Sequence, residues 1–186
     1  MRPSRVSEEE VVAKIAEAFR RHGYDGASVR LLAKATGLEA ASLYTRLPGG
    51  KEEMALKVVA RTCEWLQANV FEALHGSGTA AKKVARAARR LREFYQNGTL
   101  WCVLDTLTLG ESTVPVRVAV RGAYEAWLGE FCRVAHETGM PPAQARERAQ
   151  RAIIELEGAL VLSRVTGDGK PFVRVTQRLP ELLTKP

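Results

Sequence analysis

The first feature with a definite chemistry is a short run of small and polar residues near the N-terminus. Ser42, Thr45 and Arg46 fall on one face of a helix, beside the small residues Ala40 and Ala41. An arginine can pair with both acceptors of a guanine, and threonine and alanine methyl groups can contact the methyl of thymine. The run could therefore read base edges in the major groove of DNA.

The elements that would position this run are two short helices joined by a tight turn over residues 28–46. Ser28 can cap the first helix, and Gly37 permits a turn with positive φ. We expect Leu31, Leu32, Ala33, Ala35, Leu38 and Leu43 on the side where the helices meet. This is the layout of a helix-turn-helix with its recognition helix second. The alternative is a plain helical hairpin inside an all-α core.

Other site chemistries find no support in the spacing of reactive residues. Cys63, Cys102 and Cys132 form no Cys-x-x-Cys pair, and the three histidines (His22, His75 and His136) are equally scattered. We therefore expect no structural disulfide, no metal site, no cofactor and no enzymatic activity.

The charge is compatible with a nucleic-acid partner, but its distribution says little about where DNA would bind. The chain of 186 residues has a net charge of +7, and residues 1–60 hold ten Lys or Arg against eight Asp or Glu. Much of the excess lies in one run: Lys82, Lys83, Arg86, Arg89, Arg90 and Arg92. Helical spacing makes this run typical of a solvated face, so DNA binding depends on placed residues.

The pattern of apolar residues and helix breakers predicts an all-α fold of about nine helices. Besides the pair within 28–46, we expect helices over about 7–22, 51–75, 79–96, 113–138, 143–165 and 171–183, with a short apolar segment at 100–109. No apolar stretch is long enough to span a membrane, and residues 1–5 lack the apolar core of a signal peptide. We expect a cytoplasmic protein.

Several linked motifs resemble the N-terminal domain of TetR-family transcriptional regulators. They are residues 24–30 (Tyr-Asp-Gly-Ala-Ser-Val-Arg), 33–37, 43–44 (Leu-Tyr) and 47–54 (Leu-Pro-Gly-Gly-Lys-Glu-Glu-Met). The Pro-Gly-Gly-Lys-Glu segment and the trailing helices resemble the LmrA/YxaF-type branch. The chain departs from the family at Leu47, where an aromatic residue is common, and at Thr45-Arg46, where two aromatic or histidine residues are frequent.

The resemblance implies a domain organisation and a set of DNA contacts. Residues 1–50 would form a three-helix DNA-binding domain, and residues 51–186 a helical domain for effector binding and dimerisation. Ser28, Tyr44 and Lys51 would contact phosphates. Base contacts would fall to Ala40, Ala41, Ser42, Thr45 and Arg46.

The predicted helix 143–165 offers the best surface for a homodimer. It is apolar over more of its circumference than one core face needs, and we assign Ile154, Gly158, Ala159 and Leu162 to the interface. The family pairs its last two helices into a four-helix bundle, and an ordinary intrachain core is the alternative. Two-fold dimers would place two recognition helices about 34 Å apart on a palindromic operator.

A small-molecule effector pocket is the least defined prediction. Its candidate residues are Trp65, Phe94, Trp101, Cys102, Tyr124 and Trp127, and each could equally belong to the core. Asp105, Glu155 and Glu157 could orient a ligand, but we favour a structural role, facing solvent or an arginine of a dimer partner.

The resemblance implies a repressor that a small, mostly apolar or aromatic effector releases from DNA. One alternative is a helical small-molecule binding protein or enzyme in which the helix-turn-helix is incidental. Another is a regulator whose pocket is vestigial or that responds to a protein.

Overall fold

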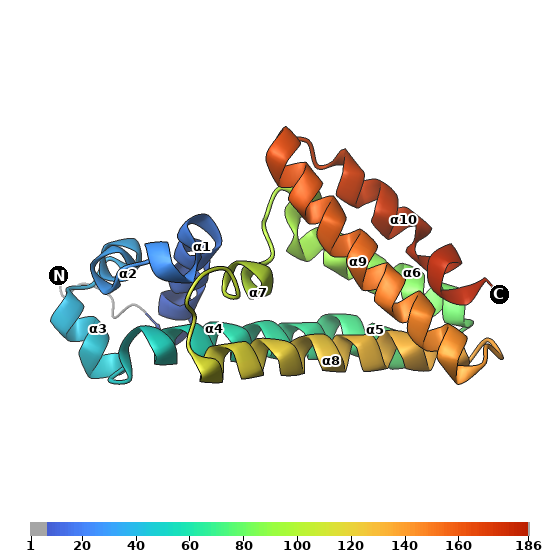
Figure 1. Cartoon of the computed structure of the whole chain (residues 1–186), viewed down its shortest axis with the longest axis horizontal. Helices are drawn as coiled ribbons and strands as arrows, with labels where there is room; N and C mark the ends of the chain where they lie inside the picture. The colour runs from blue at the N-terminus through green and yellow to red at the C-terminus, as the bar shows by residue number, and fades with distance from the viewer. Residues whose placement is uncertain (1–6, 186) are drawn as a thin grey trace. The chain divides into compact units, whose positions relative to one another are not determined.

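A computed structural model describes residues 7–185, and the regular elements within that range are all helical (Figure 1). In chain order they are α1 (Glu8–Gly26), α2 (Val29–Thr36), α3 (Ala40–Arg46), α4 (Gly50–Leu66), the π-helix η1 (Gln67–Phe71), α5 (Glu72–His75), α6 (Ala80–Phe94), the 3-10 helix η2 (Gln96–Gly98), α7 (Val103–Thr106), α8 (Val114–His136), α9 (Pro142–Thr166) and α10 (Lys170–Thr184). The predicted all-α class is confirmed. Residues 1–5, from which we inferred that no signal peptide is present, lie outside the described range.

The described residues form two compact units. The first unit contains the residues up to Cys63 together with Val103–Gly122, and the second contains Glu64–Cys102 together with the residues from Ala123 onward. Each unit has its own buried apolar core. None of the helices within residues 7–185 is both long enough and apolar enough to span a membrane.

The first unit is built on α1, whose start follows the predicted capping pattern. The hydroxyl of Ser7 accepts a hydrogen bond from the backbone N–H of Glu10 at 3.1 Å. The rings of Phe19 and Tyr24 stack in the core with centroids 6.0 Å apart. The first regular helical stretch ends near residue 22 as expected, because Gly23 is non-helical with φ at 66° and ψ at −178°, and a short helical turn follows it to Gly26. Glycine takes this φ without strain, so the chain bends at this single residue.

The buried side of α2 differs in part from the prediction. Leu32 is buried as expected, whereas Leu31 is half-buried and Ala35 is exposed. The buried stripe of this short helix instead runs through Leu32 and Thr36, which lie one turn apart. Leu31 and Ala35 flank that stripe and line a shallow surface groove beside α1.

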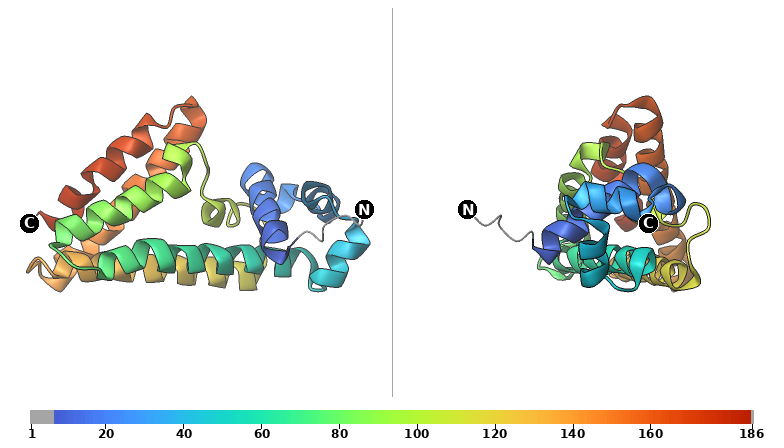
Figure 2. Two further views of the ribbon diagram at one scale, coloured as in Figure 1. Left: turned by 180° about the vertical axis from the view of Figure 1, so that it is seen from behind. Right: turned by 90° about the vertical axis from the view of Figure 1, so that its left-hand side faces the viewer.

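The second unit is organised around α6, α9 and α10. The helix α10 packs against both α6 and α9, and the three lie side by side (Figure 2). The core of the second unit includes Leu91 of α6 and Phe172 and Leu179 of α10, all fully buried. The Lys/Arg run on α6 is solvated only in part: Lys82, Arg89 and Arg90 are exposed, whereas Lys83, Arg86 and Arg92 are half-buried. Lys83 pairs with Glu137 of the same chain at 2.8 Å.

A π-helical turn interrupts the long helical stretch that we predicted over residues 51–75. It spans Gln67–Phe71, between α4 and α5. The side-chain amide of Asn69 donates a hydrogen bond to the carbonyl of Trp65 at 3.0 Å. This side chain supports the local departure from regular α-helical hydrogen bonding.

Candidate functional site

The turn between α2 and α3 is fixed by hydrogen bonds that local sequence dictates. The Ser28 hydroxyl accepts from the N–H of Leu31 at 3.2 Å, and the Thr36 hydroxyl donates to the carbonyl of Ala33 at 2.8 Å. Gly37 ends α2 in the left-handed conformation, with φ at 74°. The Ser28 contact caps the start of α2. At its end the N–H of Gly37 donates to the carbonyl of Lys34 at 3.2 Å, and this cap reverses the chain within three residues, so that α3 begins at Ala40.

One side of α3 is buried and the other is exposed. Leu43 is 0% exposed and Leu47, directly after the helix, is 2% exposed, so these two leucines anchor it. The exposed residues of the helix are Ala40, Ala41, Ser42, Tyr44, Thr45 and Arg46. The structure thus brings the five predicted base-contact residues together on the surface of α3, although their contact with bases stays a prediction.

Two of these residues have chemistry that the structure restricts. The Thr45 hydroxyl donates to the carbonyl of Ala41 at 2.9 Å, which leaves its methyl group and an acceptor lone pair for a ligand. Arg46 lies within electrostatic reach of Glu8. A hydrogen bond from Lys57 at 2.8 Å lowers the pKa of the Glu8 carboxyl, and the charge of Arg46 adds to this effect.

The three residues predicted to contact phosphates differ in how many of their polar groups remain free to bind DNA. Ser28 uses an acceptor lone pair for its cap, and Tyr44 is 46% exposed. Lys51 donates to the carbonyl of Tyr24 at 3.1 Å, and its ammonium lies 4.3 Å from the centre of the Tyr24 ring. Burial raises the pKa of Tyr24, so its hydroxyl stays neutral. Lys51 therefore also ties the start of α4 to the end of α1, a role that our sequence reasoning missed.

Two further hydrogen bonds hold loops of the first unit, and neither was predicted. Glu53 accepts from the N–H of Gly49 at 2.7 Å, a contact that an acidic residue in the first turn of α4 could have indicated. Asp25 accepts from the N–H of Glu111 at 2.8 Å, close to Gly110. No sequence signal could have shown this second contact, because 86 residues separate its partners.

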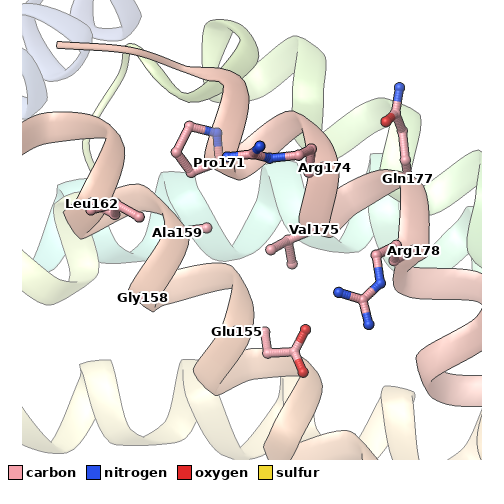
Figure 3. A pocket seen from close by; sticks show the side chains of 9 residues that line it. All are labelled: Glu155, Gly158, Ala159, Leu162, Pro171, Arg174, Val175, Gln177 and Arg178. Atoms are coloured by element: carbon pink, nitrogen blue, oxygen red, sulfur yellow. The ribbon is translucent and has the colours of Figure 1, made fainter. Parts of the chain in front are cut away.

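A groove of about 510 Å³ lies between α9 and α10 in the second unit (Figure 3). Its lining residues are Glu155, Gly158, Ala159, Leu162, Pro171, Arg174, Val175, Gln177 and Arg178. Three of the four predicted dimer residues are among them. The fourth, Ile154, lies on α9 and is 69% exposed. Two other apolar side chains of this helix are also exposed, Val165 at 75% and Leu162 at 50%. Exposed apolar patches are typical of interaction surfaces, and the assignment of these residues to a dimer interface stays a prediction.

The predicted effector residues form two aromatic contacts in the second unit. Trp65 stacks on Phe94 with ring centroids 4.2 Å apart, and Tyr124 stacks on Trp127 at 6.2 Å. The Cys102 thiol lies 3.8 Å from the Tyr124 hydroxyl. Trp127 is fully buried, and its indole N–H has no hydrogen-bond partner among the described residues.

Tyr95 joins these two groups, although we did not predict it. Its ring meets that of Phe94 edge to face at 4.9 Å, and its hydroxyl donates to the Cys102 sulfur at 3.6 Å. Burial raises the pKa of Tyr95 and of Tyr124, so both hydroxyls stay protonated. Trp101, the sixth predicted residue, lies under the guanidinium of Arg164 at 5.3 Å.

Glu157 differs from our expectation that it faces solvent or a partner's arginine. It is half-buried and accepts a hydrogen bond from the Tyr124 hydroxyl at 2.9 Å. Residues two apart on a helix point in nearly opposite directions, so Glu155 lines the outer groove while Glu157 faces the aromatic cluster. Within residues 7–185, His, Cys, Asp and Glu side chains form no group that could hold a metal ion.

Family models match both parts of the chain. The model described as "Bacterial regulatory proteins, tetR family" matches residues 11–58, and "Transcriptional regulator LmrA/YxaF-like, C-terminal domain" matches residues 80–178. The HTH-type transcriptional regulator LmrA of Bacillus subtilis is 23% identical over 183 residues, covering 96% of this chain and 97% of LmrA. YxaF of the same organism is 21% identical, covering 96% of each chain.

Solved structures share the fold over nearly the whole length. A TetR transcriptional regulator from Legionella pneumophila superposes with a TM-score of 0.83 at 19% identity, covering 99% of this chain and 100% of the other. A cysteine mutant of the TetR-family regulator CifR, complexed with 26bp double-strand operator DNA, gives 0.78 at 20% identity, covering 97% and 98%.

Proposed function

Because the chain belongs to the TetR family of transcriptional regulators, with a C-terminal domain of the LmrA/YxaF-like type, we propose that it is a cytoplasmic repressor without catalytic activity. It binds a palindromic operator as a homodimer, and a small, mostly apolar or aromatic effector releases it. Residues 1–50 bind DNA, and residues 51–186 bind the effector and form the dimer.

The observation that carries this proposal is the exposed face of α3. Leu43 and Leu47 hold the helix from beneath, while the six remaining side chains of α3 are exposed. A face of alanines can approach the floor of the major groove closely, because it has no bulk to hold the backbone away. Arg46 then reads a guanine, and the Thr45 methyl meets a thymine methyl.

Contacts to the DNA backbone set the register of this face. Tyr44 and Lys51 donate to phosphate oxygens, and the Ser28 hydroxyl has its proton available because its cap uses a lone pair. Lys51 retains two ammonium protons beyond the one given to Tyr24. One such reader covers few base pairs, which is why a two-fold dimer through α9 and α10 is part of the proposal.

The effector would bind beside the aromatic cluster of the second unit. The buried indole N–H of Trp127 has no acceptor among residues 7–185, and Glu157 and Tyr124 provide an oriented polar pair among apolar rings. A ligand that binds one conformation of the dimer more tightly shifts the population toward it and thereby changes DNA affinity.

Selection of bound sites from random double-stranded DNA tests the proposal. The expected result is a palindrome, against which Arg46→Ala loses about 1–3 kcal/mol at one base position per half-site, or roughly 5- to 150-fold in affinity. Arg21→Ala is the matched control, because it removes the same charge from α1, where Arg21 pairs with Glu17. Failure to enrich a palindrome, or equal losses for Arg46→Ala on specific and random DNA, would contradict the proposal.

A further inference from the structure

The groove between α9 and α10 is lined by two arginines that are in no salt bridge within 4.0 Å among the described residues. Arg178 projects from α10 into the groove, and Arg174 lines it alongside Pro171. The nearby carboxylate of Glu181 pairs with Lys185 at 2.7 Å, which lowers the pKa of Glu181, and the charge of Arg178 adds to this effect from a longer distance. Guanidinium groups beside an apolar surface need acceptors when that surface is covered, because an unpaired buried charge is strongly destabilising.

An acidic residue of the opposite wall enters the same groove. Glu155 projects from α9, facing the opening into which Arg178 points (Figure 3). Arg151 holds one oxygen of the Glu155 carboxylate at 2.9 Å, and the other accepts no hydrogen bond from the described residues. Glu155 therefore has acceptor capacity to spare, and it makes no ion pair with Arg178 within its own chain.

The groove thus carries both signs of charge around an apolar floor, which is the property of a self-complementary surface. In a two-fold interface, when residue i of one subunit contacts residue j of the other, j also contacts i. A single acid and a single arginine per chain then give two complementary pairs. The exposed apolar residues of α9, such as Leu162 and Val165, provide the surface that such pairs would flank.

We propose that a second copy of this chain occupies the groove, with Glu155 of each subunit paired to Arg178 of the other, and that these two pairs select the partner. The inference rests on the homodimer of the proposed function and adds the residues that decide which chains pair. Charges of this kind contribute mainly specificity, because a wrong partner sets like charges against each other.

Exchanging the charges at positions 155 and 178 tests this pairing, because single variants and their mixture should behave in opposite ways. Glu155→Arg alone sets two arginines against each other at both pairs, and Arg178→Glu alone sets two acids against each other. A mixture of the two variants restores opposite charges at both pairs. The doubly exchanged chain should pair with itself but not with the wild-type chain.

Analytical ultracentrifugation and native mass spectrometry of chains that differ in tag mass measure these outcomes. We expect each single variant to dimerise roughly 100-fold more weakly than wild type, and their mixture to form a heterodimer close to wild-type affinity. Arg174→Glu is the matched control on the same helix, and it should not restore dimerisation of Glu155→Arg. Circular dichroism shows whether each variant folds, and heterodimer formation itself requires that both do.

The results separate the two levels of the proposal. If the wild-type chain is a monomer both in solution and when bound to DNA, the homodimer and the pairing are both overturned. A dimeric wild type whose single variants dimerise normally, or whose Glu155→Arg variant is rescued by Arg174→Glu and not by Arg178→Glu, would overturn the pairing alone.

Discussion

Replacing Gly110 with alanine should destabilise the first unit through a contact with Asp25. Gly110 has φ at 82°, and a Cβ built there would overlap the carboxylate of Asp25, coming within 2.8 Å of its Cγ. The same carboxylate accepts a hydrogen bond from the N–H of Glu111 at 2.8 Å. An alanine therefore both adopts an unfavourable backbone conformation and pushes away the acceptor that holds the next residue.

The two effects can be given separate magnitudes. The left-handed conformation costs an alanine about 1–2 kcal/mol, and losing a hydrogen bond to a charged acceptor costs about 1.5 kcal/mol. Gly110→Ala should thus lower the free energy of unfolding by about 3 kcal/mol, and Asp25→Ala by about 1.5 kcal/mol. With Asp25 already removed, Gly110→Ala should cost only its backbone part, about 1.5 kcal/mol.

A double-mutant cycle in urea, followed by circular dichroism, measures this difference. The double variant should be more stable than the sum of the single losses predicts, by about 1.5 kcal/mol. Asp25→Asn is the matched control, since the amide keeps an acceptor oxygen and should lose less than the alanine variant. Strict additivity of Gly110→Ala and Asp25→Ala would refute the steric coupling between these residues.

Two further predictions concern lysines that contact other elements of the chain. Lys51→Met should lower the melting temperature, because it removes the hydrogen bond to Tyr24. It should also weaken binding to all DNA sequences alike and reduce the salt dependence of the binding constant by about one unit of slope. Lys34→Met, on the exposed side of α2, is the control, and a loss of affinity that depends on DNA sequence would contradict the phosphate role. The hydrogen bond from Lys83 lowers the pKa of Glu137 below its ordinary 4.5. Its stabilising effect is therefore complete above about pH 4.5 and is lost as pH falls through the folded-state pKa. Glu137→Gln should destabilise by less than about 1 kcal/mol at pH 7, with a difference from wild type that vanishes toward pH 3 in pH-dependent urea unfolding; a difference unchanged down to that pH would count against the linkage.

The parts of the fold that the sequence predicts are those set by nearby residues. Ser28, Gly37 and Leu43 fix the helix-turn-helix through contacts within a few positions, so spacing alone locates it. The kink at Gly23 was harder to foresee, because glycine permits both a turn and a kink. Which of the two forms depends on the core contacts of Tyr24.

The parts that could not be predicted depend on residues far apart in the chain. Glu157 lies in a mostly apolar stretch of α9, and only its hydrogen bond with Tyr124 shows that it faces the interior. Tyr95 joins the aromatic cluster for the same reason, through Cys102. A hydrogen bond between helices leaves no periodic pattern, so composition and spacing could not indicate it.

The π-helical turn at Gln67–Phe71 also bears on how the length of this chain can change in evolution. A π turn holds one residue more than an α turn, and the helix on either side keeps its orientation. Val70 and Leu74 therefore stay buried although an extra residue is accommodated here. Deleting one residue from this turn would restore a regular α-helix, whereas a deletion in α6 or α9 would rotate every later side chain by about 100°. This turn is thus a point where the chain can gain or lose a residue and keep its core.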